Sequence, residues 1–314
     1  MTSSQNAKFK ISLTAKRLFQ AIRNGLPATK RHIYALRRET QELKSAVELL
    51  GKANAPEKAN VPKIEPIEHI DQLEGFLKAA HAVECGLPIV RIGGPGDGGY
   101  LIPDDLCGIE ACFSPGVSNV YDFELDLAER NIKSFMADAS VKSIPEINPL
   151  LAFESTFIGV VDEPNFKSLD TWVGMNAPEA HNLILQMDIE GSEFDAICGA
   201  SRSTLKKFRI MAIEFHDMEK LLTPDGFRLI NLTFKKILND FSVVHIHPNN
   251  CCGSVKNGIY EIPRVMEFTF LRNDRFVNDS KLLKRITAYP HPLDAPNVPA
   301  YADFSLPPCW YPRA

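Results

Sequence analysis

An α/β fold is predicted, with a doubly wound, mostly parallel sheet of seven strands and a helical N-terminal extension. Three observations predict it. Apolar segments of strand length alternate with helical segments throughout 109–247, as in parallel strands joined by helices. The segment 183–187 is a near-continuous apolar run, as expected for a strand covered on both faces. Acidic residues and a glycine follow it directly, at the strand end where ligands of such sheets bind.

The elements follow from the hydrophobic pattern along the chain. The expected strands are 109–117, one ending at 135–138, 155–162, 183–187, 208–216, 241–247 and an antiparallel 265–271. The expected helices are 69–85, 121–131, one at 168–172, 192–206 and 224–239. The first helix places Leu73, Phe76, Leu77 and Ala80 on one face. Between it and the core, the glycine-rich stretch 90–102 predicts a tight hairpin.

Three regions are expected from composition: a basic helical extension with a linker (1–66), a main domain (67–275) and a proline-rich segment that wraps the domain (276–314). Residues 1–44 contain ten Lys or Arg and two Glu. They fit either a basic amphipathic segment on an anionic membrane surface or a flexible basic arm. Heptad spacing around 30–50 is too short for an independent coiled coil. It fits a helix docked on its own domain or on a second copy, which would make a homo-oligomer.

Composition excludes several classes of protein. The formal charge of −4 argues against a general nucleic-acid binder. Seven cysteines without a C-x-x-C spacing argue against a disulfide framework or a structural zinc site, and favour a reducing compartment. No apolar run reaches membrane-spanning length, and no signal-peptide core is present. The expected location is the cytoplasm, with peripheral membrane contact through the basic N-terminus as an open alternative.

Three short motifs resemble those of one enzyme family. Asp188-Ile-Glu190-Gly-x-Glu193 is similar to the central motif of the FkbM-type methyltransferases, which use S-adenosylmethionine. Ile213-Glu214-Phe215-His216 and Asp97-Gly98-Gly99-Tyr100 look like further marks of that family. The resemblance covers roughly 90–275. It implies a Rossmann-like fold and transfer of a methyl group to a hydroxyl of a sugar, a glycan or a glycan-like natural product.

The resemblance also implies where S-adenosylmethionine binds. The loop from Ser114 to Asn119 corresponds to the one that contacts the methionine part, although it has one glycine, Gly116, where such enzymes usually have two or three and an acidic residue. Asp138 follows that turn by about twenty residues, the spacing of an acid that accepts hydrogen bonds from ribose hydroxyls; a helix-capping role is the alternative. The expected cofactor-binding residues are Ser114, Gly116, Asp138, Asp188, Arg91 and Tyr100.

The predicted chemistry lies at the ends of three strands. An alcohol is a poor nucleophile at neutral pH and needs a general base or a metal. His216 is the expected base, oriented by Glu190 or Glu214, and the expected catalytic residues are His216, Asp188 and Glu190. A divalent metal is the alternative, with Asp188, Glu214, His216 and His247 as candidate ligands. Two carboxylates with an amide oxygen would suit magnesium or calcium, and a carboxylate with two histidines would suit manganese, iron or zinc.

Two other functions remain open at this stage. The poor glycine loop at 114–119 would suit a methyltransferase-like binding module without catalysis. The pair Asp188 and Glu190 would suit a metal-dependent, nucleotide-sugar glycosyltransferase, which leaves Asp138 without a role. The expected partner is a small-molecule or glycan acceptor, with no nucleic acid.

Overall fold

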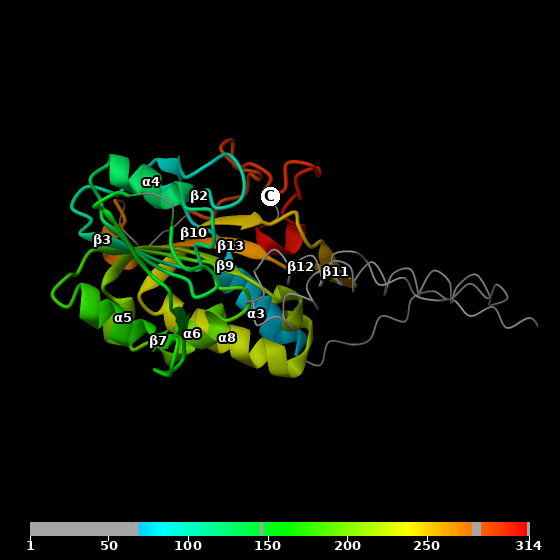
Figure 1. Cartoon of the computed structure of the whole chain (residues 1–314). Helices are drawn as coiled ribbons and strands as arrows, with labels where there is room; N and C mark the ends of the chain where they lie inside the picture. Colours follow the sequence, from blue (N-terminus) through cyan, green and yellow to red (C-terminus); the bar gives the residue numbers. More distant parts are fainter. Residues whose placement is uncertain (1–68, 145–146, 278–283, 313–314) are drawn as a thin grey trace, which may run out of the picture. The chain divides into compact units, whose positions relative to one another are not determined.

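The computed structural model describes residues 69–144, 147–277 and 284–312, which belong to one compact unit, Ile64–Ala314. The predictions for 1–66, namely helical segments, membrane contact and self-association through 30–50, lie outside the described residues. Figure 1 shows the described part in colours that follow the sequence.

Within the described residues, seven strands form the main sheet in the order β10-β13-β9-β8-β3-β4-β5. Their bounds are β3 Ala111–Pro115, β4 Ser134–Ala137, β5 Leu151–Glu154, β8 Leu183–Met187, β9 Phe208–Phe215, β10 Phe241–Pro248 and β13 Met266–Arg272. β13 is antiparallel to both of its neighbours, and the other pairs are parallel. The predicted fold class, a mostly parallel doubly wound sheet, is confirmed.

Helices cover both faces of this sheet. On one face lie α3 (Ile70–Ala80), α5 (Leu169–Asn176), α6 (Glu193–Gly199) and α8 (Pro224–Leu238), and on the other lie α4 (Asp122–Glu129) and the hairpin β1–β2 (Ile89–Ile92 and Tyr100–Pro103) (Figure 1). Strand alternation decides the face of each side chain. In β9, Met211, Ile213 and Phe215 pack against the first set of helices, whereas Ile210 and Ala212 face the hairpin side. Glu214 therefore lies on the hairpin side.

The expected elements hold with three corrections. The predicted third strand, 155–162, is wrong: β5 ends at Glu154, and Phe157–Gly159 (β6) pairs with Phe166–Ser168 (β7) in a separate small sheet. Val160 and Val161 are exposed, so this apolar run is not buried between layers. The predicted helix 192–206 breaks at Ala200, whose backbone is extended, and restarts as α7 (Arg202–Leu205). Helix α3 ends at Ala80, short of the predicted Cys85, but buries the four predicted residues.

The C-terminal segment, residues 284–312, packs on the domain with little regular structure. It contains one short 3-10 helix, η4 (Pro308–Trp310), among the described residues. Trp310 is fully buried next to Phe76 and Phe268. A second hairpin, β11–β12 (Ser254–Asn257 and Tyr260–Pro263), was not predicted; the Trp310 indole N–H donates to the carbonyl of Glu261 in it.

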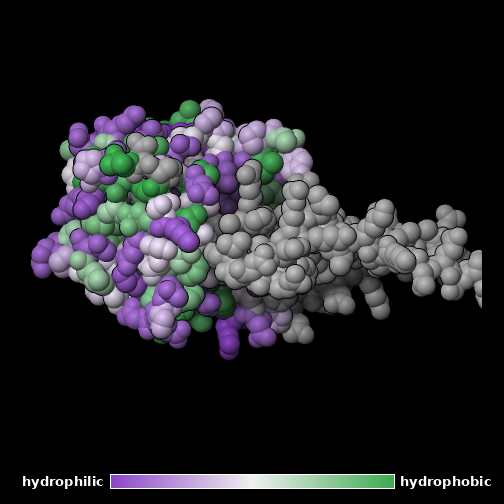
Figure 2. Space-filling view, viewed as in Figure 1, coloured by the Kyte–Doolittle hydropathy of each residue, from purple (hydrophilic) through white to green (hydrophobic). Residues whose placement is uncertain are grey.

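On the face drawn in Figure 2, hydrophilic and hydrophobic side chains are interspersed over the coloured part of the surface. Of the described helices, none combines the length and the apolar character that crossing a membrane requires.

Candidate active site at the strand ends

The strand order reverses between β3 and β8. From β3 the chain proceeds outward through β4 and β5, and it then returns to β8 on the opposite side of β3. In open α/β sheets, ligands bind at the carboxyl ends of the strands where the order reverses. Here those ends carry the loop after Pro115 and the loop after Met187, so the predicted residues Gly116 and Asp188 lie next to each other at this point.

Gly116 is required by the way these two loops meet. Its backbone has φ +94°, and a Cβ atom at this position would overlap the carbonyl oxygen of Asp188. The Asp188 amide in turn donates to the carbonyl of Pro115 at 3.2 Å. Only glycine adopts this conformation without strain while leaving room for the neighbouring backbone. In this loop the one glycine stands at the position where the backbone closely approaches that of Asp188.

Asp138 holds the loop in place. Its carboxylate, which is 2% exposed, accepts hydrogen bonds from the amides of Ser118 and Ser140, both at 2.7 Å. Ser118 has a left-handed backbone, with φ 48°, so this bond fixes a conformation that is unfavourable for serine. An ionised carboxylate has about four acceptor sites. Two are used here, so acceptor capacity for a ribose diol remains.

Ser114 points away from the loop that it begins. Its hydroxyl is fully buried between Glu124 of α4 and the side-chain oxygen of Gln186, which is 2.5 Å away. Burial raises the pKa of Glu124 to about 7, against the opposing effect of the Ser114 hydrogen bond. One hydroxyl proton cannot serve two acceptors, so a protonated Glu124 that donates to Ser114 completes the chain to Gln186. The structure thus gives Ser114 a partner inside the core rather than at the surface.

Arg91 and Tyr100 are also committed to the protein. The Arg91 guanidinium donates to the carbonyls of Gly94 at 2.8 Å and Gly96 at 3.0 Å, and so stabilises the glycine-rich turn of the predicted hairpin. Tyr100 is buried with its ring edge-on to Phe123. Burial, with Glu214 and Asp188 nearby, raises the pKa of Tyr100 well above its usual value. Tyr100 therefore borders the acidic site. Arg91 holds the turn of the hairpin that carries Tyr100.

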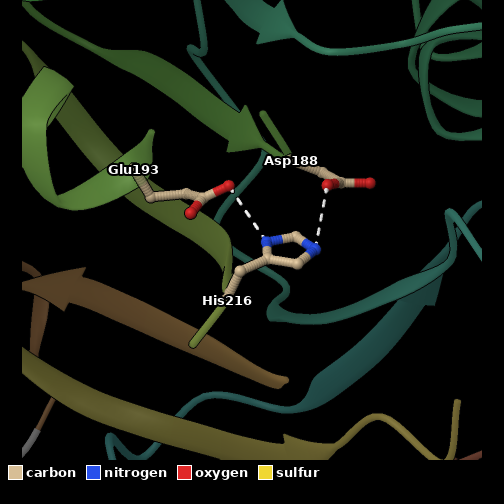
Figure 3. Close-up of side chains that lie close together, drawn as sticks. All are labelled: Asp188, Glu193 and His216. Carbon is tan, nitrogen blue, oxygen red and sulfur yellow. Dashed lines mark hydrogen bonds and ion pairs between the residues drawn. The ribbon is translucent and has the colours of Figure 1, made fainter. Parts of the chain in front are cut away.

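His216 lies at the centre of a group of four carboxylates. Its Nδ1 is 3.1 Å from Glu193, and its Nε2 is 3.4 Å from Glu190, 3.6 Å from Glu214 and 3.9 Å from Asp188. Figure 3 shows Glu193 and Asp188 on opposite sides of the ring. Asp188 and Glu190 come from the loop after β8, and Glu214 and His216 from the end of β9. As predicted, the side chains at the carboxyl ends of β8 and β9 lie close together.

Glu193, rather than Glu190 or Glu214, orients the imidazole. It is fully buried and also accepts hydrogen bonds from the amides of Ile189 and Gly191 at 3.0 and 3.1 Å. Burial would raise the pKa of Glu193, but the hydrogen bond and charge of His216 lower it below its usual value. Glu193 was not among the predicted site residues. The available signal was its place as the second glutamate of the Asp-x-Glu-Gly-x-Glu motif.

The same carboxylates decide the protonation of His216. Burial alone would lower its pKa, but the hydrogen bond that the ring donates to Glu193 and the charges of Glu193, Asp188 and Glu214 raise it to about 10. In this arrangement the ring keeps its proton at neutral pH. The role of His216 as a general base stays a prediction, and the carboxylate on its Nδ1 is Glu193 rather than the predicted Glu190 or Glu214.

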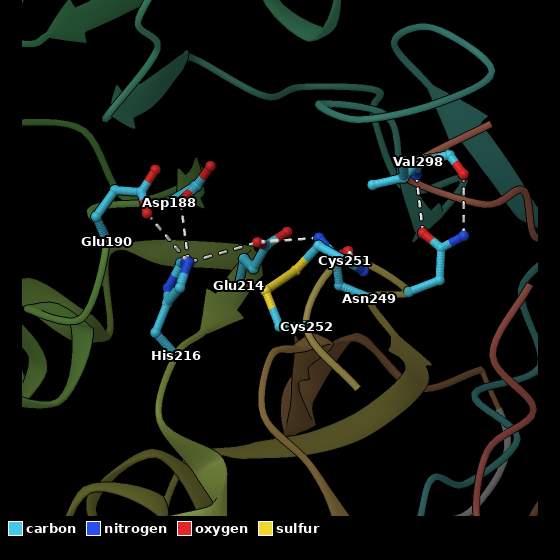
Figure 4. Close-up of a disulfide and its surroundings, with 9 residues drawn as sticks. Asp188, Glu190, Glu214, His216, Asn249, Cys251, Cys252 and Val298 are labelled. Carbon is cyan, nitrogen blue, oxygen red and sulfur yellow. Dashed lines mark hydrogen bonds and ion pairs between the residues drawn. A yellow bond between two sulfur atoms is a disulfide. The ribbon is translucent and has the colours of Figure 1, made fainter. Parts of the chain in front are cut away.

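Glu214 continues the site toward β10. Its Oε1 accepts from the Asn249 amide at 3.2 Å, and burial together with the charge of Asp188 raises the pKa of Glu214 well above its usual value. Figure 4 shows Glu214 and Asn249 beside the pair Cys251 and Cys252. Those neighbouring cysteines are joined by a disulfide, and the Cys251 amide donates to Asn249 at 2.8 Å. The disulfide joins adjacent residues, so it does not cross-link distant parts of the fold.

His247 and Asn250 belong to a different set of contacts. His247 lies between Glu267, at 3.6 Å, and Asp303 of the C-terminal segment, at 3.4 Å. Asn250 is hydrogen-bonded to the backbone of Val298, Tyr301 and Ala302. Both residues hold the C-terminal segment, and the structure does not place His247, a predicted candidate metal ligand, with the ligand atoms around His216.

Among the side chains around His216, Asp188, Glu193 and the ring itself offer ligand atoms that lie within 4.8 Å of one another, close enough to share a metal ion.

No protein-family model matches the chain, and no curated protein matches it. Solved structures similar to it include a protein from Listeria monocytogenes assigned as an S-adenosylmethionine-dependent methyltransferase (10% identity, TM-score 0.32, 52% of this chain and 91% of that chain). Two others are the N-methyltransferase NodS from Bradyrhizobium japonicum WM9 (9%, 0.30, 66% and 97%) and magnesium protoporphyrin IX methyltransferase from Synechocystis PCC 6803 with bound SAH (10%, 0.30, 73% and 94%).

Proposed function

We propose that this protein is an S-adenosylmethionine-dependent methyltransferase that acts on a hydroxyl group of a sugar, glycan or glycan-like molecule. The observation that carries the proposal is the junction of β3, β4 and β8. There a glycine loop, the ribose-type acid Asp138 and the acidic loop after β8 lie at adjoining carboxyl ends, where the strand order reverses.

The charge around this junction suits the cofactor. S-adenosylmethionine carries a positive sulfonium and a positive amino group, and the partly exposed Asp188 and Glu190 give the site negative charge. Asp138 retains acceptor capacity for the ribose hydroxyls beside the two amides that it binds. Methyl transfer then requires alignment of the acceptor oxygen with the methyl carbon and removal of one proton. The partly exposed carboxylates Asp188 and Glu190 are the groups placed to meet an acceptor.

The nature of the acceptor rests on the resemblance of the Asp188–Glu193 and Ile213–His216 motifs to the FkbM-type enzymes. A hydroxyl acceptor agrees with a site rich in carboxylates, because an alcohol must lose its proton as the oxygen attacks the methyl group.

The test is calorimetric titration of the full chain with S-adenosylmethionine and S-adenosylhomocysteine. Binding in the micromolar range is expected, and Asp138→Ala should abolish it. Asp240→Ala is the matched control, because it removes a carboxylate with two hydrogen bonds to Arg202, at 2.7 and 2.8 Å, next to the amino end of β10. Circular dichroism establishes that both variants are folded. Absence of binding by the folded, unaltered chain would contradict the proposal and favour a non-catalytic module.

A further inference from the structure

We propose that His216, Asp188, Glu190 and Glu214 form a binding site for a divalent cation of the manganese type, with Glu193 as the carboxylate that orients the histidine ligand. Binding of the cation does not depend on the proposed function. In the proposed methyltransferase the cation would activate the acceptor hydroxyl, and this role rests on the proposed function.

The distances around Nε2 support a shared ion. Direct hydrogen bonds between imidazole and carboxylate are about 2.7–3.2 Å long. The three carboxylate oxygens lie instead at 3.4, 3.6 and 3.9 Å from Nε2. Ligands about 2.1 Å from one metal are separated from each other by about 3.0 Å at right angles and about 4.2 Å on opposite sides. All three separations fall inside that range.

Glu193 completes a pattern typical of metal-bound histidine. The ring nitrogen that does not face the metal usually donates to a carboxylate, which fixes the tautomer and the ring orientation. Here Nδ1 faces Glu193 at 3.1 Å, whereas the other three carboxylates approach Nε2. Glu193 lies close enough to Asp188 and His216 to be a ligand itself. However, both its oxygens already accept backbone amides, so it is better suited to holding the ring.

Glu214 gives an independent indication of a ligand. It is buried, and its Oε2 has no hydrogen-bond partner among the described residues. Its other oxygen, Oε1, accepts from Asn249 at 3.2 Å and lies 3.6 Å from Nε2 of His216 (Figure 4). A buried carboxylate oxygen without a partner is unfavourable. A cation held by both oxygens of Glu214 would satisfy Oε2 and balance the nearby negative charge.

Access to the ion would be from the loop after β8. The side chains of Asp188 and Glu190 are 21% and 22% exposed, whereas those of Glu214 and His216 are buried. Glu190 has φ 61°, a left-handed conformation that is unfavourable for glutamate. Strain of this kind persists at sites where it places a functional side chain. Here it directs the carboxylate toward Nε2.

The donor set selects the class of ion. Carboxylate oxygens suit magnesium, calcium and manganese, and imidazole suits the transition metals. One imidazole with three carboxylates is intermediate, and manganese accepts both kinds of donor.

The test uses the full chain after dialysis against EDTA, titrated with MnCl₂. The paramagnetic resonance signal of free Mn²⁺ reports binding without any activity assay. One bound ion per chain is expected. Glu190→Gln and Glu214→Gln should each weaken binding at least about tenfold. Glu190 is partly exposed, so its variant stays informative if Glu214→Gln fails to fold. Glu267→Gln is the matched control: it removes a charge from the neighbouring strand, opposite Glu214, and should bind Mn²⁺ within about threefold of the unaltered chain.

Absence of Mn²⁺ binding, or equal binding by the Glu190→Gln and Glu214→Gln variants, would overturn the proposal. Titration of S-adenosylhomocysteine with and without EDTA separates the two proposals. Cofactor binding without Mn²⁺ binding would refute the cation site alone, and Mn²⁺ binding without cofactor binding would refute the methyltransferase alone.

Discussion

Gly116 lies directly against the carbonyl oxygen of Asp188, which leaves no room for a Cβ atom between the loop after β3 and the loop after β8. This contact joins the two halves of the sheet at the position where the strand order reverses. It also fixes the separation of the predicted cofactor loop from the acidic loop that carries Asp188 and Glu190.

Replacing this glycine should therefore damage both stability and cofactor binding. Gly116→Ala combines an unfavourable φ of +94° with overlap of the Asp188 backbone, and we expect a loss of more than about 2 kcal/mol in the free energy of unfolding. Gly253→Ala is the control, because Gly253 has φ +69° but nothing within 4 Å of an added Cβ. It should cost about 1 kcal/mol. Urea unfolding measures both, and equal losses would refute the importance of the contact.

Glu124 should make stability fall as pH rises. Burial raises its pKa from 4.5 to about 7, so between these values the folded chain binds a proton that the unfolded chain has released. Its contribution is complete below about pH 4.5 and is lost by about pH 7, a change of about 3 kcal/mol. Glu124→Gln should remove this slope when urea unfolding is measured from pH 5 to 8.

The control for that slope is Glu110→Gln. Hydrogen bonds from the backbone of His181 and Asn182 lower the pKa of Glu110, so this residue is ionised throughout pH 5–8 and its loss should leave the slope unchanged. A Glu124→Gln variant with the original pH dependence would show that Glu124 is ionised in the folded chain.

Glu193 should contribute strongly to stability because it pairs with a buried charge. Glu193→Gln leaves the ring of His216 without its hydrogen-bonded anion, and breaking such a buried pair costs about 3 kcal/mol. Asp195→Asn makes the same charge change in the same helical turn at an exposed position, and should cost less than about 0.5 kcal/mol. Thermal unfolding compares them, and a small effect at Glu193 would mean that the other carboxylates suffice for His216.

The helices and strands were predicted correctly where buried apolar residues are continuous or recur at a regular spacing. β8, the antiparallel β13 and the buried face of α3 all have near-continuous or regularly spaced apolar residues, and such patterns report the local environment directly. The acids after β8 and β9 were found because strand ends of a parallel sheet meet at one edge.

Contacts that depend on distant segments were not predictable in this way. His247 resembles His216 in sequence, a histidine near a strand end, but it is held by Asp303 from the C-terminal segment. The position of the third strand depended on pairing with β4 rather than on hydropathy, since Val160 and Val161 are apolar and exposed. The inward direction of Ser114 could have been found, because alternation along β3 sets it opposite Phe113.

Asn250 should keep the C-terminal segment on the domain. Its amide donates to the carbonyls of Val298 at 3.1 Å and Ala302 at 3.2 Å, and its oxygen accepts the Val298 amide at 2.8 Å. Asn250→Ala removes these bonds, and we expect about 2 kcal/mol of lost stability and faster chymotrypsin cleavage at the exposed Tyr301. Asn176→Ala, which loses one bond to the carbonyl of Trp172 in its own helix, is the control. Equal cleavage rates in the two variants would mean that Trp310 and its neighbours hold the segment without Asn250.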